Sequence, residues 1–273
     1  MWAGLPLFPQ IPLRLESQFS RLKEEGNDSA GGSKGPARPF GGVRGGPAFL
    51  PHLPPEAVQE QRNLNSYGRR EHILESTESI TTYFSELEQM LRDISQPHLQ
   101  QVLSLLADAY YNGHRMFIMG NGGSAATASH FALDLAKNTI TPGAPRLKAI
   151  SLTDHVPLIT AWSNDTAYEH IFEEQLANMI EPGDVVIGIS TSGKSPNVIN
   201  ALRLAKQTPA ATIGLLGANG GLIKHIVDAY VLAPGQNIEQ EEDAHMILAH
   251  VITRHMREVV HSYAQKLALA GTN

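Results

Sequence analysis

Short apolar runs alternate with segments of helical periodicity from residue 115 onward. Five runs of four to six residues are predicted as strands, over 115–119, 147–152, 185–189, 211–216 and 229–232. Runs this short are typical of strands buried on both faces of a parallel sheet. The segments between and after them are predicted as helices over 125–137, 156–162, 168–179, 197–206 and 241–264, with turns at 163–165 and 220–221. This alternation predicts an α/β fold with a doubly wound, mostly parallel sheet of about five strands.

Two further helices are predicted ahead of the first strand. Apolar residues at steps of three and four form one helical stripe, made up of Ile80, Phe84, Leu87, Leu91 and Ile94. A second helix over 98–111 ends at Asn112 and Gly113, where glycine favours a helix stop. Because both helices precede the sheet, we expect them to pack against it or to mediate oligomerisation.

The first 70 residues differ in composition from the rest of the chain. Between residues 26 and 55 there are eight glycines and six prolines, and such a segment cannot bury enough surface to offset the entropy lost on ordering. We therefore expect a disordered Gly/Pro-rich tail over 1–70 and one folded domain over 71–273. The sequence leaves open whether the tail binds a partner or lies upstream of the natural start.

Composition narrows the classes of function. The formal net charge is −6, so there is no general basic field and no direct nucleic-acid binding is expected. The chain has no cysteine, which excludes disulfides and thiolate metal sites and fits a cytoplasmic location. No stretch approaches the roughly 20 apolar residues of a membrane span. The N-terminal residues are interrupted by prolines and lack the basic lead of a signal peptide.

A cluster of hydroxyl side chains follows the strand over 185–189. This hydroxyl loop, residues 190–195, carries Ser190, Thr191, Ser192 and Ser195 and is followed by Pro196, a favourable first residue of a helix. Open α/β sheets bind ligands at the carboxyl ends of their strands. Hydroxyl donors and free N–H groups at a helix start suit a phosphate. An ordinary strand-to-helix turn is the alternative, but four hydroxyls in six residues favour phosphate binding.

A glycine turn follows the first predicted strand. It covers residues 120–124 and comprises Gly120, Asn121, Gly122, Gly123 and Ser124. A strand, a glycine-rich turn and a helix in succession allow the backbone to approach an anion closely. The turn does not match the dinucleotide-binding pattern, so it indicates an anion site of moderate specificity and no redox cofactor.

Ionisable side chains gather on two predicted helices. His130 and Asp134 are four residues apart and share one helix face, and the terminal helix carries Glu242 and His250. Imidazoles and carboxylates of this kind serve as acid/base pairs or as ligands of a zinc-like ion. Each histidine has the alternative of being a core or surface residue without a role in chemistry, and for His245 we favour this alternative.

The motifs together resemble the SIS (sugar isomerase) domain, in its phosphoheptose isomerase branch. They are GNGGSAATASHFALDL, SND, ISTSGKSPNV and EEDAHMILAHVI, in that order, and the resemblance covers roughly residues 76–263. It implies a flavodoxin-like sheet with extra N-terminal helices and a homotetramer with active sites between subunits. A replication-initiator-associating protein shares much of this pattern, so a non-catalytic SIS module that binds a sugar phosphate or a protein partner is the alternative function.

The resemblance also implies roles for single residues. The substrate-binding positions match Asn121, Gly122, Gly123, Ser124, Asn164, Asp165, Ser190, Thr191, Ser192 and Ser195. The metal-binding positions match His130, Asp134, Glu242 and His250, of which Asp134, Glu242 and His250 are also candidates for the catalytic acid/base groups. One zinc ion per site would polarise a carbonyl or order the site, and no redox cofactor is implied.

Two positions depart from the family's pattern. Asp134 stands where the family has a glutamate, and Glu242 stands where it has a glutamine. Asp134 is one methylene shorter, so from the sequence we expect Asp134→Glu to keep or improve activity. Glu242 makes the metal set more anionic, which favours a divalent cation. The predicted function is an aldose–ketose isomerase acting on a phosphorylated sugar, with sedoheptulose 7-phosphate as the expected substrate.

Overall fold

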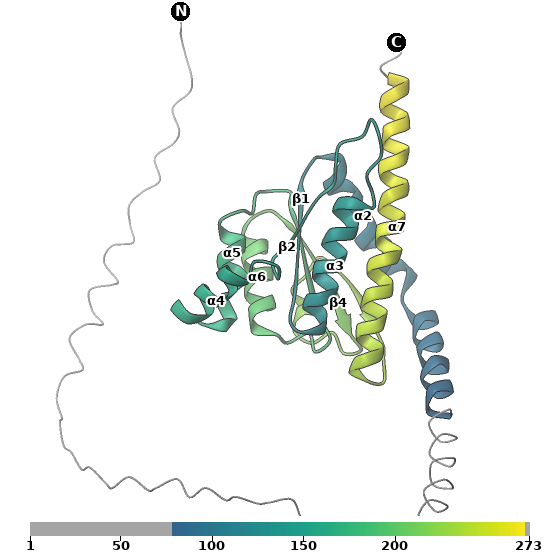
Figure 1. Ribbon diagram of the computed structural model, residues 1–273, viewed down its shortest axis with the longest axis vertical. Helices are drawn as coiled ribbons and strands as arrows, with labels where there is room; N and C mark the ends of the chain where they lie inside the picture. The colour runs from purple at the N-terminus through teal and green to yellow at the C-terminus, as the bar shows by residue number, and fades with distance from the viewer. Residues whose placement is uncertain (1–77, 271–273) are drawn as a thin grey trace, which may run out of the picture. The chain divides into compact units, whose positions relative to one another are not determined.

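The computed structural model describes residues 78–270 (Figure 1). The chain divides into two units, Met1–Val58 and Gln59–Asn273, and all described residues belong to the second. The predicted tail over 1–70 lies outside the described residues. The first described element is a helix over 78–93, in agreement with the predicted apolar stripe. It is tied to the long C-terminal helix by Tyr83, whose hydroxyl donates to Asp243 over 2.6 Å.

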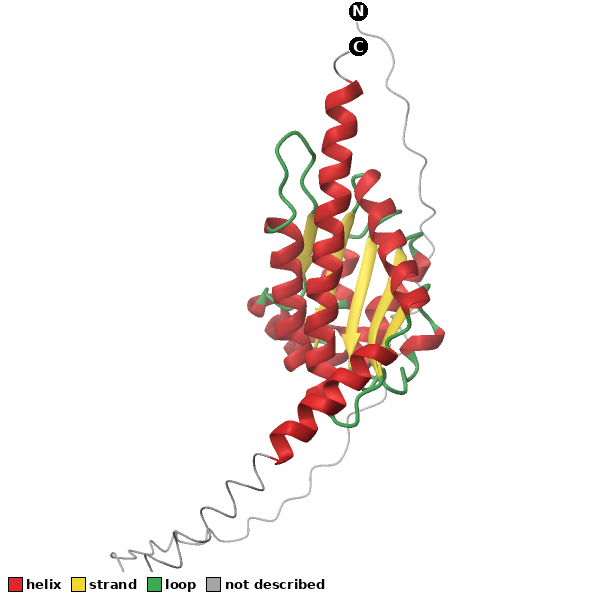
Figure 2. Cartoon of the chain, turned by 90° about the vertical axis from the view of Figure 1, so that its right-hand side faces the viewer, coloured by secondary structure: helices red, strands yellow, loops and turns green. Residues whose placement is uncertain are grey.

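Five parallel strands form one sheet in the order β2-β1-β3-β4-β5. Their bounds are β1 Arg115–Gly120, β2 Lys148–Ser151, β3 Val185–Ser190, β4 Ala211–Gly217 and β5 Ala229–Ala233. The strands point the same way in Figure 2. This order is flavodoxin-like. The predicted doubly wound α/β fold is therefore confirmed, with a sheet that is entirely parallel.

Helices cover both faces of the sheet (Figure 1). One face carries α2 Gln96–Tyr111, α3 Gly123–Lys137 and α7 Ile238–Ala270, and the other carries α4 Val156–Asp165, α5 Glu173–Ala177 and α6 Pro196–Gln207. Successive strand residues point to opposite faces. In β1, Met116 and Ile118 accordingly join the core under α3 and α7, whereas Phe117 and Met119 join the core under α5 and α6.

The region between β2 and β3 differs from the prediction. The expected turn at 163–165 is the last part of α4, because Thr166 closes the helix with its N–H and its hydroxyl both donating to the carbonyl of Trp162. The expected helix over 168–179 is broken into a 3-10 turn, η1 Tyr168–His170, and the short α5. Between them, Ile171 and Phe172 turn into the core. Burial of these two side chains thus overrides the helical periodicity.

The amino end of the sheet is held by a buried carboxylate, Asp184. It accepts hydrogen bonds from the backbone N–H of Arg115 (2.8 Å), from the N–H of Glu181 (2.9 Å) and from the Arg115 guanidinium (3.1 Å). These bonds join the starts of the neighbouring strands β1 and β3. The far end of the same two strands is left free for ligand-binding loops. In residues 78–270, no helix is long and apolar enough to cross a membrane.

The carboxyl ends of β1 and β3 form the topological switch point of the sheet. From β1 the chain passes to β2 on one side, and from β3 it passes to β4 on the other. Flavodoxin-like sheets bind ligands in the crevice at this point. The glycine turn follows β1 and the hydroxyl loop follows β3, so the two predicted anion-binding segments lie at this crevice.

Candidate functional site

The hydroxyl loop gathers three serine side chains at the carboxyl end of β3, whose last residue is Ser190. Ser190 Oγ lies 3.2 Å from Ser195 Oγ and 3.4 Å from Ser192 Oγ. The N–H of Gly193 donates to Ser190 Oγ over 3.1 Å and holds this buried hydroxyl at the centre of the loop. Three hydroxyl groups in contact provide several donors for one anionic oxygen or phosphate group.

The helix that follows the hydroxyl loop begins without a side-chain cap. Ser195 occupies the N-cap position of α6, but its hydroxyl makes no capping bond and lies instead beside Ser190. Pro196 takes the next position and has no N–H to satisfy. The positive end of the helix dipole therefore adjoins the three hydroxyls, which adds to their attraction for an anion.

Two glycine turns meet behind the hydroxyl loop. Gly193 has a φ of +59°, and Gly220 and Gly221 have φ values of +67° and +51°. A Cβ on Gly193 would lie 2.1 Å from the carbonyl oxygen of Gly220, so the two backbones touch directly. The N–H of Ile223 also donates to the carbonyl of Gly193 over 3.0 Å. The predicted turn at 220–221 is confirmed, and it fixes the position of the hydroxyl loop.

Glu242 reaches the glycine turn from α7. A Cβ on Gly123 would lie 2.3 Å from Glu242 Oε1, so the carboxylate rests against the first residue of α3. The N-cap residue of α3, Gly122, offers no side-chain cap. A carboxylate at this helix start is favourable because it faces the positive end of the dipole. The carboxylate of Glu242 therefore already occupies part of the anion-binding position at the glycine turn.

An amide pair joins the glycine turn to α6. Asn121 Nδ2 donates to Asn197 Oδ1 over 2.9 Å, and Asn197 Nδ2 donates to Asn121 Oδ1 over 2.8 Å. The hydroxyl of Tyr168 donates to Asn121 Oδ1 as well, over 3.0 Å. Asn197 is 1% exposed, whereas Asn121 is half-buried at the crevice. The sequence analysis did not single out Asn197 or Tyr168.

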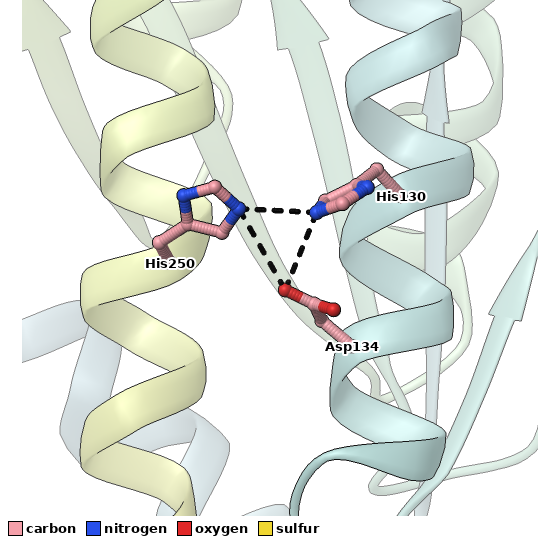
Figure 3. A group of neighbouring side chains, drawn as sticks. All are labelled: His130, Asp134 and His250. Atoms are coloured by element: carbon pink, nitrogen blue, oxygen red, sulfur yellow. Dashed lines mark hydrogen bonds and ion pairs between the residues drawn. The ribbon is translucent and has the colours of Figure 1, made fainter.

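Two histidines and an aspartate form a second group where α3 and α7 run side by side (Figure 3). The Nε2 atoms of His130 and His250 lie 3.0 Å apart, and Asp134 Oδ2 lies 3.4 Å from the first and 3.8 Å from the second. Asp134 is buried and its Oδ1 accepts a hydrogen bond from Asn138 (2.6 Å). The histidine side chains are 43% and 54% exposed, so the group opens to the surface of the subunit.

The spacing of this group fits a zinc ion. Zinc bonds of about 2.0–2.1 Å in a tetrahedral arrangement place neighbouring ligand atoms roughly 3.3 Å apart. The three observed separations, 3.0, 3.4 and 3.8 Å, bracket that value. Asn138 holds the carboxylate from behind, as outer hydrogen bonds hold metal ligands in general. His130, Asp134 and His250 are therefore suited to hold a metal, with a fourth position open to water or substrate.

Comparison with known proteins identifies the family. The profile of the SIS domain matches residues 82–217. The chain is 39% identical over 178 residues to the phosphoheptose isomerase of Geotalea daltonii, covering 64% of this chain and 92% of that protein. It is 35% identical to the phosphoheptose isomerase of Aquifex aeolicus, covering 69% and 98% of the two chains. The chain belongs to the phosphoheptose isomerase family.

A solved structure agrees with this assignment. The phosphoheptose isomerase of Neisseria gonorrhoeae superposes with a TM-score of 0.62 at 30% identity, over 67% of this chain and 98% of that chain. The predicted resemblance to the SIS domain and to its phosphoheptose isomerase branch is confirmed, as is the predicted enzyme class, an aldose–ketose isomerase.

The residues that the phosphoheptose isomerase resemblance selected fall into separate groups. Ser190, Ser192 and Ser195 converge in the hydroxyl loop, and His130, Asp134 and His250 converge between α3 and α7. Glu242 is not part of the histidine group and lies against Gly123 instead. Asn164 and Asp165 lie exposed at the end of α4, bonded to each other through Asn164 Nδ2 and Asp165 Oδ1 (2.9 Å).

A polar cleft adjoins the hydroxyl loop on the side of β4. Its volume is about 420 Å³, and its lining includes Thr191, Ser192, Lys194, Asn219 and Glu241. Burial raises the pKa of Glu241, although its Oε1 accepts a hydrogen bond from the N–H of Ala218 (2.8 Å). Sequence reasoning had not selected Glu241, although it opens the EEDAHMILAHVI motif, nor Asn219, which lies outside the four motifs.

His245 occupies the core, which is one of the two structural positions that the sequence left open for it. It is fully buried in α7, and both ring nitrogens lie outside hydrogen-bonding geometry to the described part of the chain. Burial lowers the pKa of His245 to about 4, and the nearby carbonyl of Leu216 acts in the opposite direction. The side chain is therefore a neutral core residue rather than a metal ligand.

Proposed function

We propose that the protein isomerises sedoheptulose 7-phosphate to a heptose 7-phosphate. The observation that carries this proposal is the hydroxyl cluster of Ser190, Ser192 and Ser195 at the switch point of a phosphoheptose isomerase fold. The relatives in Geotalea daltonii and Aquifex aeolicus bear the name of the same reaction. The cluster would bind the phosphate and so anchor one end of the sugar.

Phosphate is better accommodated at the hydroxyl loop than at the glycine turn. Glu242 places a carboxylate directly against Gly123, which would repel a second anion there. The hydroxyl loop offers several donors and an uncapped helix start. We assign the phosphate to the hydroxyl loop, including Thr191. We assign the uncharged part of the sugar to the glycine turn, where Gly122 and Ser124 would contact it. Asn164 and Asp165 remain proposed substrate contacts, because they match the substrate-binding positions of the family motif.

Isomerisation requires two proton movements. A base removes a proton from C1 of the ketose while O2 gains a proton, which gives an enediol. O1 then loses its proton and C2 gains one, which gives the aldose. Asp134 is a poor candidate for the base because both of its oxygens are engaged, one with Asn138 and one with the histidines. Glu242 stands free of that group at the glycine turn. We therefore assign the carbon-bound proton to Glu242 and, when no metal is held by the histidine group, the oxygen-bound proton to His250.

A zinc ion would be held by His130, Asp134 and His250, with Glu242 as a further candidate ligand. When bound, it would supply a Lewis acid beside the substrate's oxygens. The phosphate group and the base act through residues of the chain in either case. No redox cofactor enters the proposal, because isomerisation moves hydrogen within one molecule.

A homotetramer with active sites between subunits completes the proposal. Large apolar side chains are exposed near the histidine group and on the first helix, namely Ile80 (55%), Phe84 (64%), Leu133 (55%) and Val251 (43%). Burial of such side chains between copies of the chain would stabilise an assembly. A phosphorylated sugar is charged and does not cross a lipid bilayer, so we also propose a cytoplasmic location.

The decisive experiment follows exchange of the C1 proton of sedoheptulose 7-phosphate into deuterated water by NMR. We expect exchange and aldose formation with the purified protein. Ser192→Ala and Ser195→Ala each remove a donor to a charged oxygen, so we expect roughly 10- to 100-fold weaker substrate binding in calorimetry. Ser104→Ala, at an exposed position of α2, is the control. Binding of sugar phosphate without exchange would instead support the non-catalytic SIS module.

The assembly is tested separately. Light scattering should give four subunits. Mixing two impaired variants, His130→Ala and Ser192→Ala, should restore part of the activity if each site draws on two subunits. A monomer with full activity would disprove the shared site while leaving the proposed reaction intact.

A further inference from the structure

The amide pair of Asn121 and Asn197 has two conceivable arrangements. If both amide groups are turned by 180°, the two bonds between them remain, with donors and acceptors exchanged. The choice between the arrangements comes from a third group, the backbone N–H of Val198. It contacts the side chain of Asn197 over 3.0 Å. A backbone N–H only donates, so the Asn197 atom that faces it is the oxygen.

The orientation of Asn197 then sets that of its partner. With Oδ1 turned toward Val198 and toward Asn121 Nδ2, the Nδ2 of Asn197 faces Asn121 and donates to its Oδ1. The same Oδ1 also accepts from the hydroxyl of Tyr168. Both lone pairs of this carbonyl oxygen are thereby used. One N–H of Asn121 has no partner in the described part of the chain, and the oxygen of Tyr168 keeps its lone pairs.

We propose that Asn197 is a positioning residue that fixes what the crevice offers to a sugar. Through it, the N–H of Val198 makes Asn121 present a hydrogen-bond donor and makes Tyr168 present an acceptor. A neighbouring carbonyl and hydroxyl, or two adjacent hydroxyls, match such a pair. The inference rests on the proposed function, because the sugar is placed at the glycine turn by that proposal.

The burial and position of Asn197 indicate that it orients Asn121 and does not contact the sugar itself. Asn197 is 1% exposed and so does not reach a ligand itself, whereas Tyr168 is 55% exposed and Asn121 half-buried. Asn197 lies two residues after Ser195, at the second position of α6. One element therefore carries both the phosphate-binding hydroxyls and the amide that orients Asn121. This arrangement fixes the sugar-binding groups relative to the phosphate.

Two substitutions test the orientation in different ways. Asn197→Leu has a similar shape but neither donates nor accepts, so Asn121 is free to rotate. Asn197→Asp keeps the acceptor for Val198, but one of its two contacts with Asn121 then joins two oxygens in either orientation of that amide. Asn200→Leu and Asn200→Asp are matched controls on the same helix, where Asn200 donates to the carbonyl of Glu169 over 3.1 Å.

The readout is the ratio of affinities for sedoheptulose 7-phosphate and inorganic phosphate, measured by calorimetry on the full chain. A change in charge or folding affects both ligands, whereas the orientation of Asn121 affects only the sugar. We expect the ratio to fall about 10-fold in both Asn197 variants and to stay constant in both Asn200 variants. In the active enzyme, kcat/KM should fall by at least the same factor, with a rise in KM.

Each outcome is decisive. An unchanged ratio in both Asn197 variants, with an active wild-type enzyme, disproves the positioning role and leaves the proposed function standing. A wild-type protein that binds the sugar phosphate but does not turn it over disproves the proposed reaction, while the ratio still tests the inference. A wild-type protein that binds the sugar phosphate no better than phosphate disproves both.

Discussion

At the scale of single residues, the two acidic side chains of the site differ in how much of their bonding capacity is used. Asp134 is buried, and its oxygens contact Asn138 on one side and the two histidines on the other. Glu242 rests against the side-chain-free Gly123 and stands apart from the histidine group. The first arrangement suits a metal ligand and the second suits a group that moves a proton.

This division predicts the behaviour of Glu242→Gln. The substitution removes the base but keeps the size of the side chain, so kcat should fall about 10²- to 10⁴-fold. Zinc content, measured by elemental analysis, should stay the same. Glu239→Gln, at an exposed position of the same helix, is the control. Loss of zinc with little change in kcat would show that Glu242 is a ligand instead.

The geometry around Asp134 favours the opposite result for Asp134→Glu to the one expected from the sequence. From the sequence, the longer side chain was expected to restore the family's reach and to keep or improve activity. In the structure the carboxylate already lies 3.4 Å from His130 Nε2 and is held by Asn138. An added methylene would displace it by roughly 1 Å, and we expect zinc content to fall and kcat to drop about 100-fold. Asp108→Glu on α2 is the control, and higher activity would favour the sequence-based expectation.

Some of the site could be read from the sequence and some could not. The hydroxyl loop and the spacing of His130 and Asp134 were visible because local chain geometry alone brings their members together. Asn197 and Tyr168 were not, because an isolated polar residue acquires its role from a partner far along the chain. Tyr168 meets Asn121 across 47 positions. Pairings of this kind depend on tertiary structure, which no short motif encodes.

At the scale of elements, α7 carries groups for several tasks on one long helix. Glu242 faces the glycine turn, His250 faces α3, and His245 points into the core. The sequence predicted this helix over 241–264, whereas it spans Ile238–Ala270. Weak periodicity at both ends explains the shorter prediction, since the ends of the helix carry mostly exposed residues.

The buried His245 predicts how stability depends on pH. Burial lowers its pKa to about 4 in the folded protein. Below pH 6.5 the unfolded chain therefore binds a proton that the folded protein does not bind, and stability falls as the pH drops from 6.5 toward 4. The loss should be about 2 kcal/mol by pH 5.

Denaturation between pH 5 and 7.5 measures this effect. His245→Leu should remove about 2 kcal/mol of this pH-dependent loss of stability, because leucine has no titratable group in either the folded or the unfolded chain. His261→Leu, at an exposed position of the same helix, should keep the slope of the wild type. A slope that is equal in all three proteins would contradict the assignment to His245.

At the scale of the whole molecule, the order of strands and helices followed from hydrophobic patterning because the three central strands, β1, β3 and β4, are buried on both faces. β3 is buried at all six positions, which is why its apolar run was continuous. The break between η1 and α5 was not predicted, since the sequence pattern over 168–179 continues without a break signal across Ile171 and Phe172.

The chain is expected to fold without its first 66 residues. The Gly/Pro-rich segment has no apolar periodicity to contribute to a core. A chain that starts at Tyr67 should keep the melting midpoint, the oligomeric state and the activity of the full chain. A midpoint lowered by several degrees, or a smaller assembly, would show that the segment contributes to the folded structure.

The contact between Gly193 and Gly220 limits how this enzyme can acquire new substrates. Any side chain at Gly193 would collide with the backbone of the neighbouring turn, and one at Gly221 would lie 2.4 Å from the Gly193 carbonyl. Directed evolution toward other sugar phosphates should therefore leave these glycines constant.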